Sequence, residues 1–118
     1  MKTKEDNIIA VKSYSFAVRC VKLYKYLCDE KHDYTIGKQL LRSGTSIGAN
    51  VKEATRGISK ADFTAKMSIS LKEASESEFW IEILRDTNYI NSQQAESMLN
   101  DCQELLKLLM SIVKSSKQ

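Results

Sequence analysis

The sequence contains no proline and only four glycines among its 118 residues. Proline usually makes up about 5% of a protein, so roughly six are missing. Hairpins, tight turns and long loops rely on these two residues, whereas long helices do not need them. Their scarcity argues against a β-rich or loop-rich fold and favours long, uninterrupted helices.

No apolar run approaches the length that crosses a membrane, which is about 18 residues. The N-terminal region is charged and leads into an amphipathic stretch, so it lacks the unbroken apolar core of a signal peptide. We therefore expect a cytoplasmic protein that has no membrane partner.

Residue types that carry out catalysis are also scarce. The single histidine, His32, lies in a short polar segment, where we expect a solvated turn, and one histidine cannot supply the paired Glu-x-x-His motifs of di-iron bundles. The cysteines Cys20, Cys28 and Cys102 form no CxxC pair, so we expect small buried residues in a reducing compartment. We predict no catalytic site, no metal and no cofactor.

Apolar residues recur every three or four positions in four segments, which we expect to be helices at about 7–30, 34–56, 60–88 and 92–114. The links between these segments are short, so consecutive helices must be antiparallel neighbours. The pattern predicts one domain over residues 1–118, folded as an all-α, up-down-up-down four-helix bundle.

The first two segments have wide apolar faces. In the second, Gly44 and Gly48 flank the apolar face, which indicates either close approach by another helix or a bend. Gly57 is expected to end this helix as a C′ glycine. In the first segment, two stripes are expected to face the core: Ala10, Tyr14, Ala17, Val21, Tyr24 and Cys28, and beside them Phe16, Cys20, Leu23 and Leu27.

The third segment has two apolar faces. One is a seam that begins at Phe63, alternates by steps of four and three, and is made of small residues at its centre. Ile69, Trp80 and Ile83 lie about 120° round the helix from this seam. We interpret them as an oligomer interface, and the alternative is a core face that is simply wide.

Four glutamates also cluster on the third segment. Carboxylates can act as acids and bases when they are buried, but Lys72 and Arg85 lie nearby on the same helix. We therefore expect a solvated, ion-paired face, made of Glu73, Glu76, Glu78 and Glu82.

The charge is unevenly distributed: the chain is +3 overall, with an excess of Lys and Arg in residues 1–60 and of Asp and Glu in residues 61–118. On the second segment, cations recur on the side opposite the apolar face, with no acidic residue among them. Such a row can follow a phosphate backbone without reading bases, and a solvated helix face is the alternative. The row consists of Lys38, Arg42, Lys52 and Arg56, with Lys60 just beyond the turn.

The run QLLRSGTSIGANVKEA at 39–54 resembles the signature of the four-helix-bundle proteins encoded in 23S rRNA intervening sequences. Also similar to that family are SKADF at 59–63, LKEA at 71–74, the pair Phe79-Trp80 and the turn at 88–90. The resemblance implies a bundle that assembles into a ring-like homopentamer. The same family includes the accessory protein of diversity-generating retroelements, a basic pentamer that binds nucleic acid and its reverse transcriptase.

The sequence as a whole favours a non-enzymatic, oligomeric binding protein that engages RNA or DNA through the cations of its second helix. The alternative is a protein–protein adaptor whose partner is another protein, such as a polymerase. An enzyme is the least supported class, because nucleophiles paired with bases and clustered metal ligands are missing.

Overall fold

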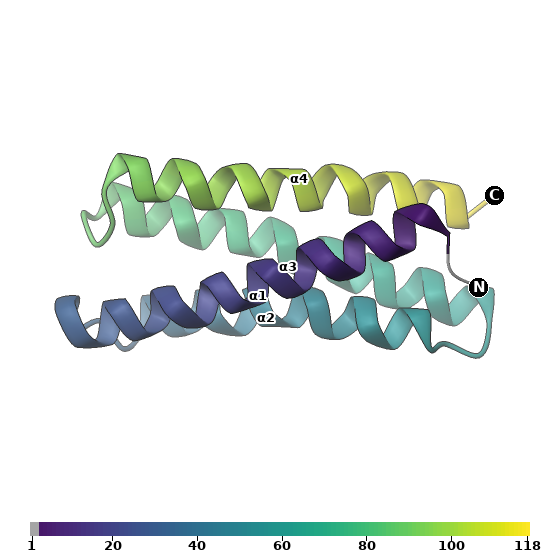
Figure 1. Ribbon diagram of the computed structural model, residues 1–118, viewed down its shortest axis with the longest axis horizontal. Helices are drawn as coiled ribbons and strands as arrows, with labels where there is room; N and C mark the ends of the chain where they lie inside the picture. Colours follow the sequence, from purple (N-terminus) through teal and green to yellow (C-terminus); the bar gives the residue numbers. More distant parts are fainter. Residues whose placement is uncertain (1–2) are drawn as a thin grey trace.

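The structure, a computed structural model that describes residues 3–118, is a bundle of four long helices. α1 spans Lys4–Lys31, α2 Ile36–Thr55, α3 Lys60–Asp86 and α4 Ser92–Ser116. Consecutive helices run antiparallel (Figure 1), and α1 and α3 occupy opposite corners, each packed between α2 and α4. The bundle measures 44 × 20 × 18 Å, and within the described residues no helix is long and apolar enough to cross a membrane. The predicted all-α four-helix bundle is confirmed.

Side-chain caps decide where α1 and α4 begin. α1 starts earlier than expected because Thr3 Oγ1 accepts the Asp6 N–H, and Asp6 Oδ2 accepts the Thr3 N–H, both at 3.1 Å. α4 starts at the expected residue, with Asn91 and Gln94 as the same kind of reciprocal pair. Each reciprocal pair, known as a capping box, provides acceptors for two N–H groups at the helix start that have no partner within the helix. α3 ends earlier than expected, and Asn88 in the following link adopts a left-handed conformation.

Asp33 fixes the turn between α1 and α2 and delays the start of α2 relative to the expected position. The exposed His32, with a φ of 54°, ends α1 in the left-handed region, so the chain reverses there. The buried Asp33 carboxylate then accepts the N–H groups of Thr35, Ile36 and Gly37 at 3.2, 3.1 and 2.7 Å. One side chain therefore satisfies three N–H groups at the start of α2.

Gly57 does not end α2 in the expected way. Gly57 lies at the expected C′ position, directly after the C-cap residue Arg56, but within the described part of the chain no glycine has a positive φ, so the left-handed conformation usual for a C′ glycine is not adopted. The position instead lacks room for a side chain, because a Cβ would lie 2.6 Å from Asp62 Oδ2 and 3.1 Å from the Ala54 carbonyl oxygen. Asp62 is held there by the start of α3, where Ser59 Oγ accepts its N–H at 3.0 Å. The α2–α3 link is therefore tight at Gly57, and a side chain at this position would displace the Asp62 carboxylate.

The helices of the core approach one another through small residues. A Cβ on Gly44 would lie 2.3 Å from Cys20 Sγ, and one on Gly48 would lie 3.3 Å from the Ser13 carbonyl oxygen. Close approach of α1 therefore explains both glycines. Across the α2–α3 contact, the buried hydroxyl oxygens of Ser43 and Ser77 lie 2.8 Å apart.

One of the two apolar stripes of α1 faces solvent. The stripe that contains Phe16, Cys20 and Leu27 is buried, as predicted. The neighbouring stripe is exposed at Ala10, Tyr14 and Val21, so its assignment to the core is wrong. Because α1 packs only between α2 and α4, it can bury one arc and must leave the other outside. Periodicity identifies both arcs as apolar and does not say which one faces inward.

The three cysteines are free thiols in different environments. Burial raises the pKa of both the Cys20 and the Cys102 thiols to about 12, whereas Cys28 is only half-buried. The thiolate is the reactive species, so Cys20 and Cys102 should be protected in the folded protein.

We therefore expect a thiol reagent at pH 8 to modify Cys28 first and the other two only after unfolding in urea. Mass spectrometry of digested, alkylated protein measures the order. Because the pKa of these two thiols is about 9 in the unfolded chain and about 12 in the folded protein, their ionisation lowers the free energy of unfolding only as the pH rises from about 9 toward 12. Rapid labelling of Cys20 in the native protein would contradict this account.

Candidate nucleic-acid interface

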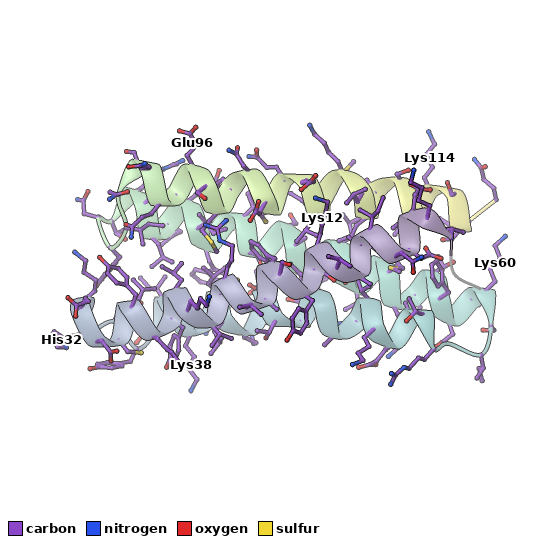
Figure 2. All side chains as sticks on the ribbon, in the orientation of Figure 1. Lys12, His32, Lys38, Lys60, Glu96 and Lys114 are labelled. Atoms are coloured by element: carbon purple, nitrogen blue, oxygen red, sulfur yellow. The ribbon has the colours of Figure 1, made fainter. Side chains whose placement is uncertain are left out.

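The cations predicted on the second helix line the outer face of α2. Lys38, Lys52 and Arg56 are exposed, and none of them forms a salt bridge with any other residue in the range 3–118. Lys52 and Arg56 lie one helical turn apart, and Lys60 begins α3 directly after the link. In Figure 2, Lys38 and Lys60 lie near opposite ends of the bundle. The row therefore follows the length of α2, with its densest part at the end where α3 begins.

Arg42 is the exception in this row, because α3 supplies carboxylates to it. Its guanidinium donates to Glu73 Oε1 at 3.3 Å and to Glu76 Oε2. Glu76 Oε2 also accepts the indole N–H of Trp80 at 2.9 Å. No acidic residue lies within the row on α2 itself, but two glutamates of α3 neutralise the charge of Arg42. Arg42 therefore ties α2 to α3 and is less available to an external phosphate than its neighbours.

Two of the four α3 glutamates predicted to be ion-paired, Glu73 and Glu76, are so, and their partner lies on α2 instead of α3. Glu78 accepts a hydrogen bond from Gln103, and within residues 3–118 neither Glu78 nor Glu82 forms a salt bridge. Arg42 pairs with Glu73 and Glu76, whereas Arg85 pairs with Asp86 at 2.8 Å. A second link of the same kind joins Lys66 of α3 to Glu53 of α2 at 3.0 Å. These partly exposed pairs hold the α2–α3 flank together and contribute little stability each, about 0–1 kcal/mol.

Further cations gather at the end of the bundle where the row is densest. The C-terminal turn of α4 lies beside the start of α3, since Thr64 Oγ1 donates to Ser116 Oγ at 2.9 Å and the Lys60 ammonium donates to the Gln118 carbonyl oxygen. Figure 2 shows Lys60 and Lys114 at this same end. Sequence reasoning missed the exposed Lys114 because it is far from the α2 row in the chain. The antiparallel topology brings them together.

A hollow of about 560 Å³ opens at this end, between the first turn of α1, the α2–α3 link and the last turns of α4. Its lining includes the apolar side chains of Ala54, Phe63 and Ile112, with Glu5 and Lys60 among the polar groups. Ile58, which also lines the hollow, is 99% exposed. Among residues 3–118 the lining holds neither histidine nor cysteine, and none of its hydroxyl groups is paired with a general base.

Two cations of α1, Lys12 and Arg19, contribute to the fold. Lys12 Nζ lies 3.0 Å from Glu104 Oε1, and Arg19 Nη1 lies 2.6 Å from Asp101 Oδ2. Arg19 also donates to the carbonyl oxygen and the hydroxyl of Ser97. These bonds join α1 to α4, the pair of neighbouring helices that packs least closely. The basic half of the sequence is thus partly neutralised by the acidic half within the same molecule.

The residues predicted for an oligomer interface lie on the outer flank of α3. Ile69 is 41% exposed, and Trp80 and Ile83 are half-buried. Trp80 also packs against the core and meets Phe79 edge-on, with ring centroids 5.0 Å apart. The structure therefore gives Trp80 a role inside the chain and leaves Ile69 and Phe79 facing solvent.

The described residues provide no geometry for metal binding, because nowhere in residues 3–118 do three His, Cys, Asp or Glu side chains come together. Every buried side-chain nitrogen or oxygen in that range has a hydrogen-bond partner. No buried polar group there is left to bind a ligand.

Comparison with known proteins gives a consistent match over most of the chain. The profile of the 23S rRNA-intervening sequence protein family matches residues 5–111. The fold is also similar to the 1.70 Å crystal structure of a protein of unknown function from the S23 ribosomal protein family of Bacteroides thetaiotaomicron VPI-5482, with a TM-score of 0.92 and 53% sequence identity. That similarity covers 93% of this chain and 98% of the other. A search of curated proteins found no match.

Proposed function

The chain belongs to the 23S rRNA-intervening sequence protein family, and we propose that it is a non-enzymatic, oligomeric protein that binds nucleic acid electrostatically. The proposed contact is the cationic end of the bundle, which we define as Lys52, Arg56, Lys60 and Lys114. Lys38 extends this surface along α2. We further propose that the protein acts in the cytoplasm and without a cofactor.

The observation that carries this proposal is the exposed cation row on the outer face of α2. Within residues 3–118, Lys38, Lys52 and Arg56 of this row form no salt bridge, whereas Arg42 of the row and the cations Lys12, Arg19 and Lys66 elsewhere are all paired. Unpaired lysine and arginine side chains at the spacing of one helical turn can each approach a phosphate, and the condensed counterions that they release supply the affinity. Such a contact reaches the phosphates and does not depend on the bases, so both RNA and DNA are proposed ligands.

Assembly would strengthen the contact. A single chain carries a net charge of only +3, so one copy should bind weakly. Several copies that present the same surface to one strand convert later contacts into intramolecular ones, which raises the overall affinity without new interactions. The proposed binding form is therefore the oligomer.

The test is a binding titration with fluorescent single-stranded RNA and DNA at 50 and 200 mM salt. We expect submicromolar binding at low salt that weakens at least about tenfold at high salt, because several phosphate contacts are lost. The double variant Lys52→Glu, Arg56→Glu should weaken binding by about a hundredfold or more at low salt. Arg42→Glu is a poor probe, since it would also disrupt the contact with Glu73 and Glu76.

A matched control is the double variant Lys31→Glu, Lys107→Glu, which changes the net charge equally but alters exposed cations outside the proposed contact. It should retain most of the binding. Equal losses in both variants would mean that net charge alone acts, and this would refute the α2 site. Absence of binding at 50 mM salt would remove the nucleic-acid function and favour the protein–protein adaptor.

A further inference from the structure

The hollow at the cationic end of the bundle has an apolar floor. Ala54 and Ile112 line it and are buried, so they lie at its bottom, and the half-buried Phe63 also lines it while packing against the core. Its volume of about 560 Å³ falls within the range of about 300–1,000 Å³ that is usual for small-ligand sites, which are mostly apolar with a few polar groups. The hollow is therefore large enough for an organic group of one or two rings.

Ile58 extends the apolar lining out to the rim of the hollow. It lies in the α2–α3 link and is 99% exposed, so its side chain contributes almost nothing to the core. Phe63 adds an aromatic ring, and aromatic rings stack favourably on other flat rings. A planar group bound in the hollow would cover apolar surface of both side chains.

The groups around this apolar lining are cationic. Arg56 directly precedes Gly57 in the link, and Lys52 lies one helical turn before Arg56. Neither cation forms a salt bridge within residues 3–118. Lys60 itself lines the hollow, and its bond to the Gln118 carbonyl oxygen uses one of the three N–H groups of the ammonium. A ligand that joins a planar ring to a phosphate therefore matches both parts of the site.

Two carboxylates of α1 also line the hollow and restrict what enters it. Asp6 accepts the Thr3 N–H through Oδ2, and the exposed Glu5 accepts the Ser111 hydroxyl through Oε2 at 3.4 Å. A carboxylate has about four acceptor positions, so both side chains retain acceptor capacity. They repel a phosphate but accept an exocyclic amino group, such as that of cytosine. The phosphate must therefore stay on the cations at the rim, while the base enters.

We propose that the hollow receives one unpaired nucleobase of a strand whose phosphates lie on Lys52, Arg56 and Lys60. This inference rests on the proposed nucleic-acid function and adds a preference for single strands to it. The bases of a duplex are paired and stacked, so none of them can enter, whereas a base of a single strand can turn out and stack on an aromatic side chain. The cations still hold any phosphate backbone, and the hollow adds affinity for single-stranded RNA or DNA.

The test compares two strands of equal charge. One is a fluorescein-labelled strand of ten deoxycytidines, and the other has the same length and label but an abasic tetrahydrofuran residue at every position. Both keep every phosphate, and only the first has bases. At 50 mM salt and pH 7.5 the strand with bases should bind at least about tenfold more tightly, as expected for one stacked base.

Two variants without a change of charge should abolish this difference. Phe63→Leu combined with Ile58→Ser removes the ring and the exposed aliphatic group, while leucine keeps the contact with the core. Ser115→Leu, at an exposed position of the lining, narrows the hollow and leaves the core untouched. Met110→Ser, which changes an exposed apolar residue outside the hollow, is the control and should keep the difference. Circular dichroism and thermal melting verify that each variant folds.

A duplex of ten base pairs depends only on the cations, so it should bind the variants as tightly as it binds the unaltered protein. A hollow variant that weakens duplex and single strand equally would overturn the inference, as would a folded variant that keeps the preference for bases. Equal binding of the two strands to the unaltered protein would also overturn it, and steep salt dependence of both would then keep the cationic contact. Absence of binding by every probe would remove the proposed function and this inference together.

Discussion

Replacement of Gly44 by alanine should destabilise the bundle by about 3 kcal/mol, at the upper end of the usual cost of overpacking a core. The added Cβ would lie 2.3 Å from Cys20 Sγ, 3.2 Å from Cys20 Cβ and 3.5 Å from a ring carbon of Phe16. All three atoms belong to buried side chains on α1, so α1 must move away from α2 to make room. Urea unfolding followed by circular dichroism measures the loss.

The sign of the change in the free energy of unfolding distinguishes an effect of packing from an effect of helix propensity. Alanine is favoured over glycine by about 1 kcal/mol inside an exposed helix, so propensity alone predicts a stabilised protein. Truncation at Cys20 provides the control: Gly44→Ala combined with Cys20→Ala should be more stable than Gly44→Ala alone, because the sulfur that collides is gone. Cys20→Ser should give less relief than Cys20→Ala, since its smaller oxygen still occupies most of the place of the sulfur. If Gly44→Ala is neutral or stabilising, the close approach of α1 and α2 is wrong.

Replacement of Asp33 by alanine should cost about 2–3 kcal/mol, because backbone N–H groups at the start of α2 lose their acceptor. The loss exceeds that of an ordinary helix cap for two reasons. One carboxylate serves three N–H groups, and Gly37, whose N–H donates at 2.7 Å, is buried and cannot turn to water. Urea unfolding gives the global effect, and hydrogen exchange at Ile36 and Gly37 gives the local one.

Asp33→Asn is the matched variant, because it keeps the shape and one acceptor oxygen. It should recover part of the stability, since Oδ1 can still accept from Thr35 and Ile36, while the amide nitrogen faces the Gly37 N–H without bonding to it. Exchange at Gly37 should then remain fast while that at Ile36 slows. Equal stability of the alanine variant and the unaltered protein would show that water or another group caps α2.

The number, type and order of the helices follow from the sequence alone. In a segment without proline whose apolar residues recur at helical spacing, the α-helix pairs the backbone N–H and C=O groups and also places the apolar residues on one side. Links of a few residues then allow only an antiparallel arrangement of consecutive helices. The start of the fourth helix at residue 92 was also predictable, because the side chain of Asn91 that accepts the Gln94 N–H lies within three residues of it.

The α2 surface could be predicted only in part from the sequence. The sequence places the cations of α2 on one side, but Arg42 is paired with residues 31 and 34 positions away, and Lys114 joins the row from another helix. Which charge remains free depends on how α3 and α4 are rotated about their axes. The proposed site therefore shifted from the middle of α2 to one end of the bundle.

Periodicity determined that the chain forms amphipathic helices in an up-down-up-down bundle, because it reports which residues share an arc of a single helix. Tertiary packing decided which of the two apolar arcs of α1 is buried and which cations of α2 stay unpaired. The physical reason is that burial and ion pairing depend on the rotation of each helix against its neighbours. That rotation is set by contacts such as Gly44 with Cys20 and Ser43 with Ser77, whose members come from different helices.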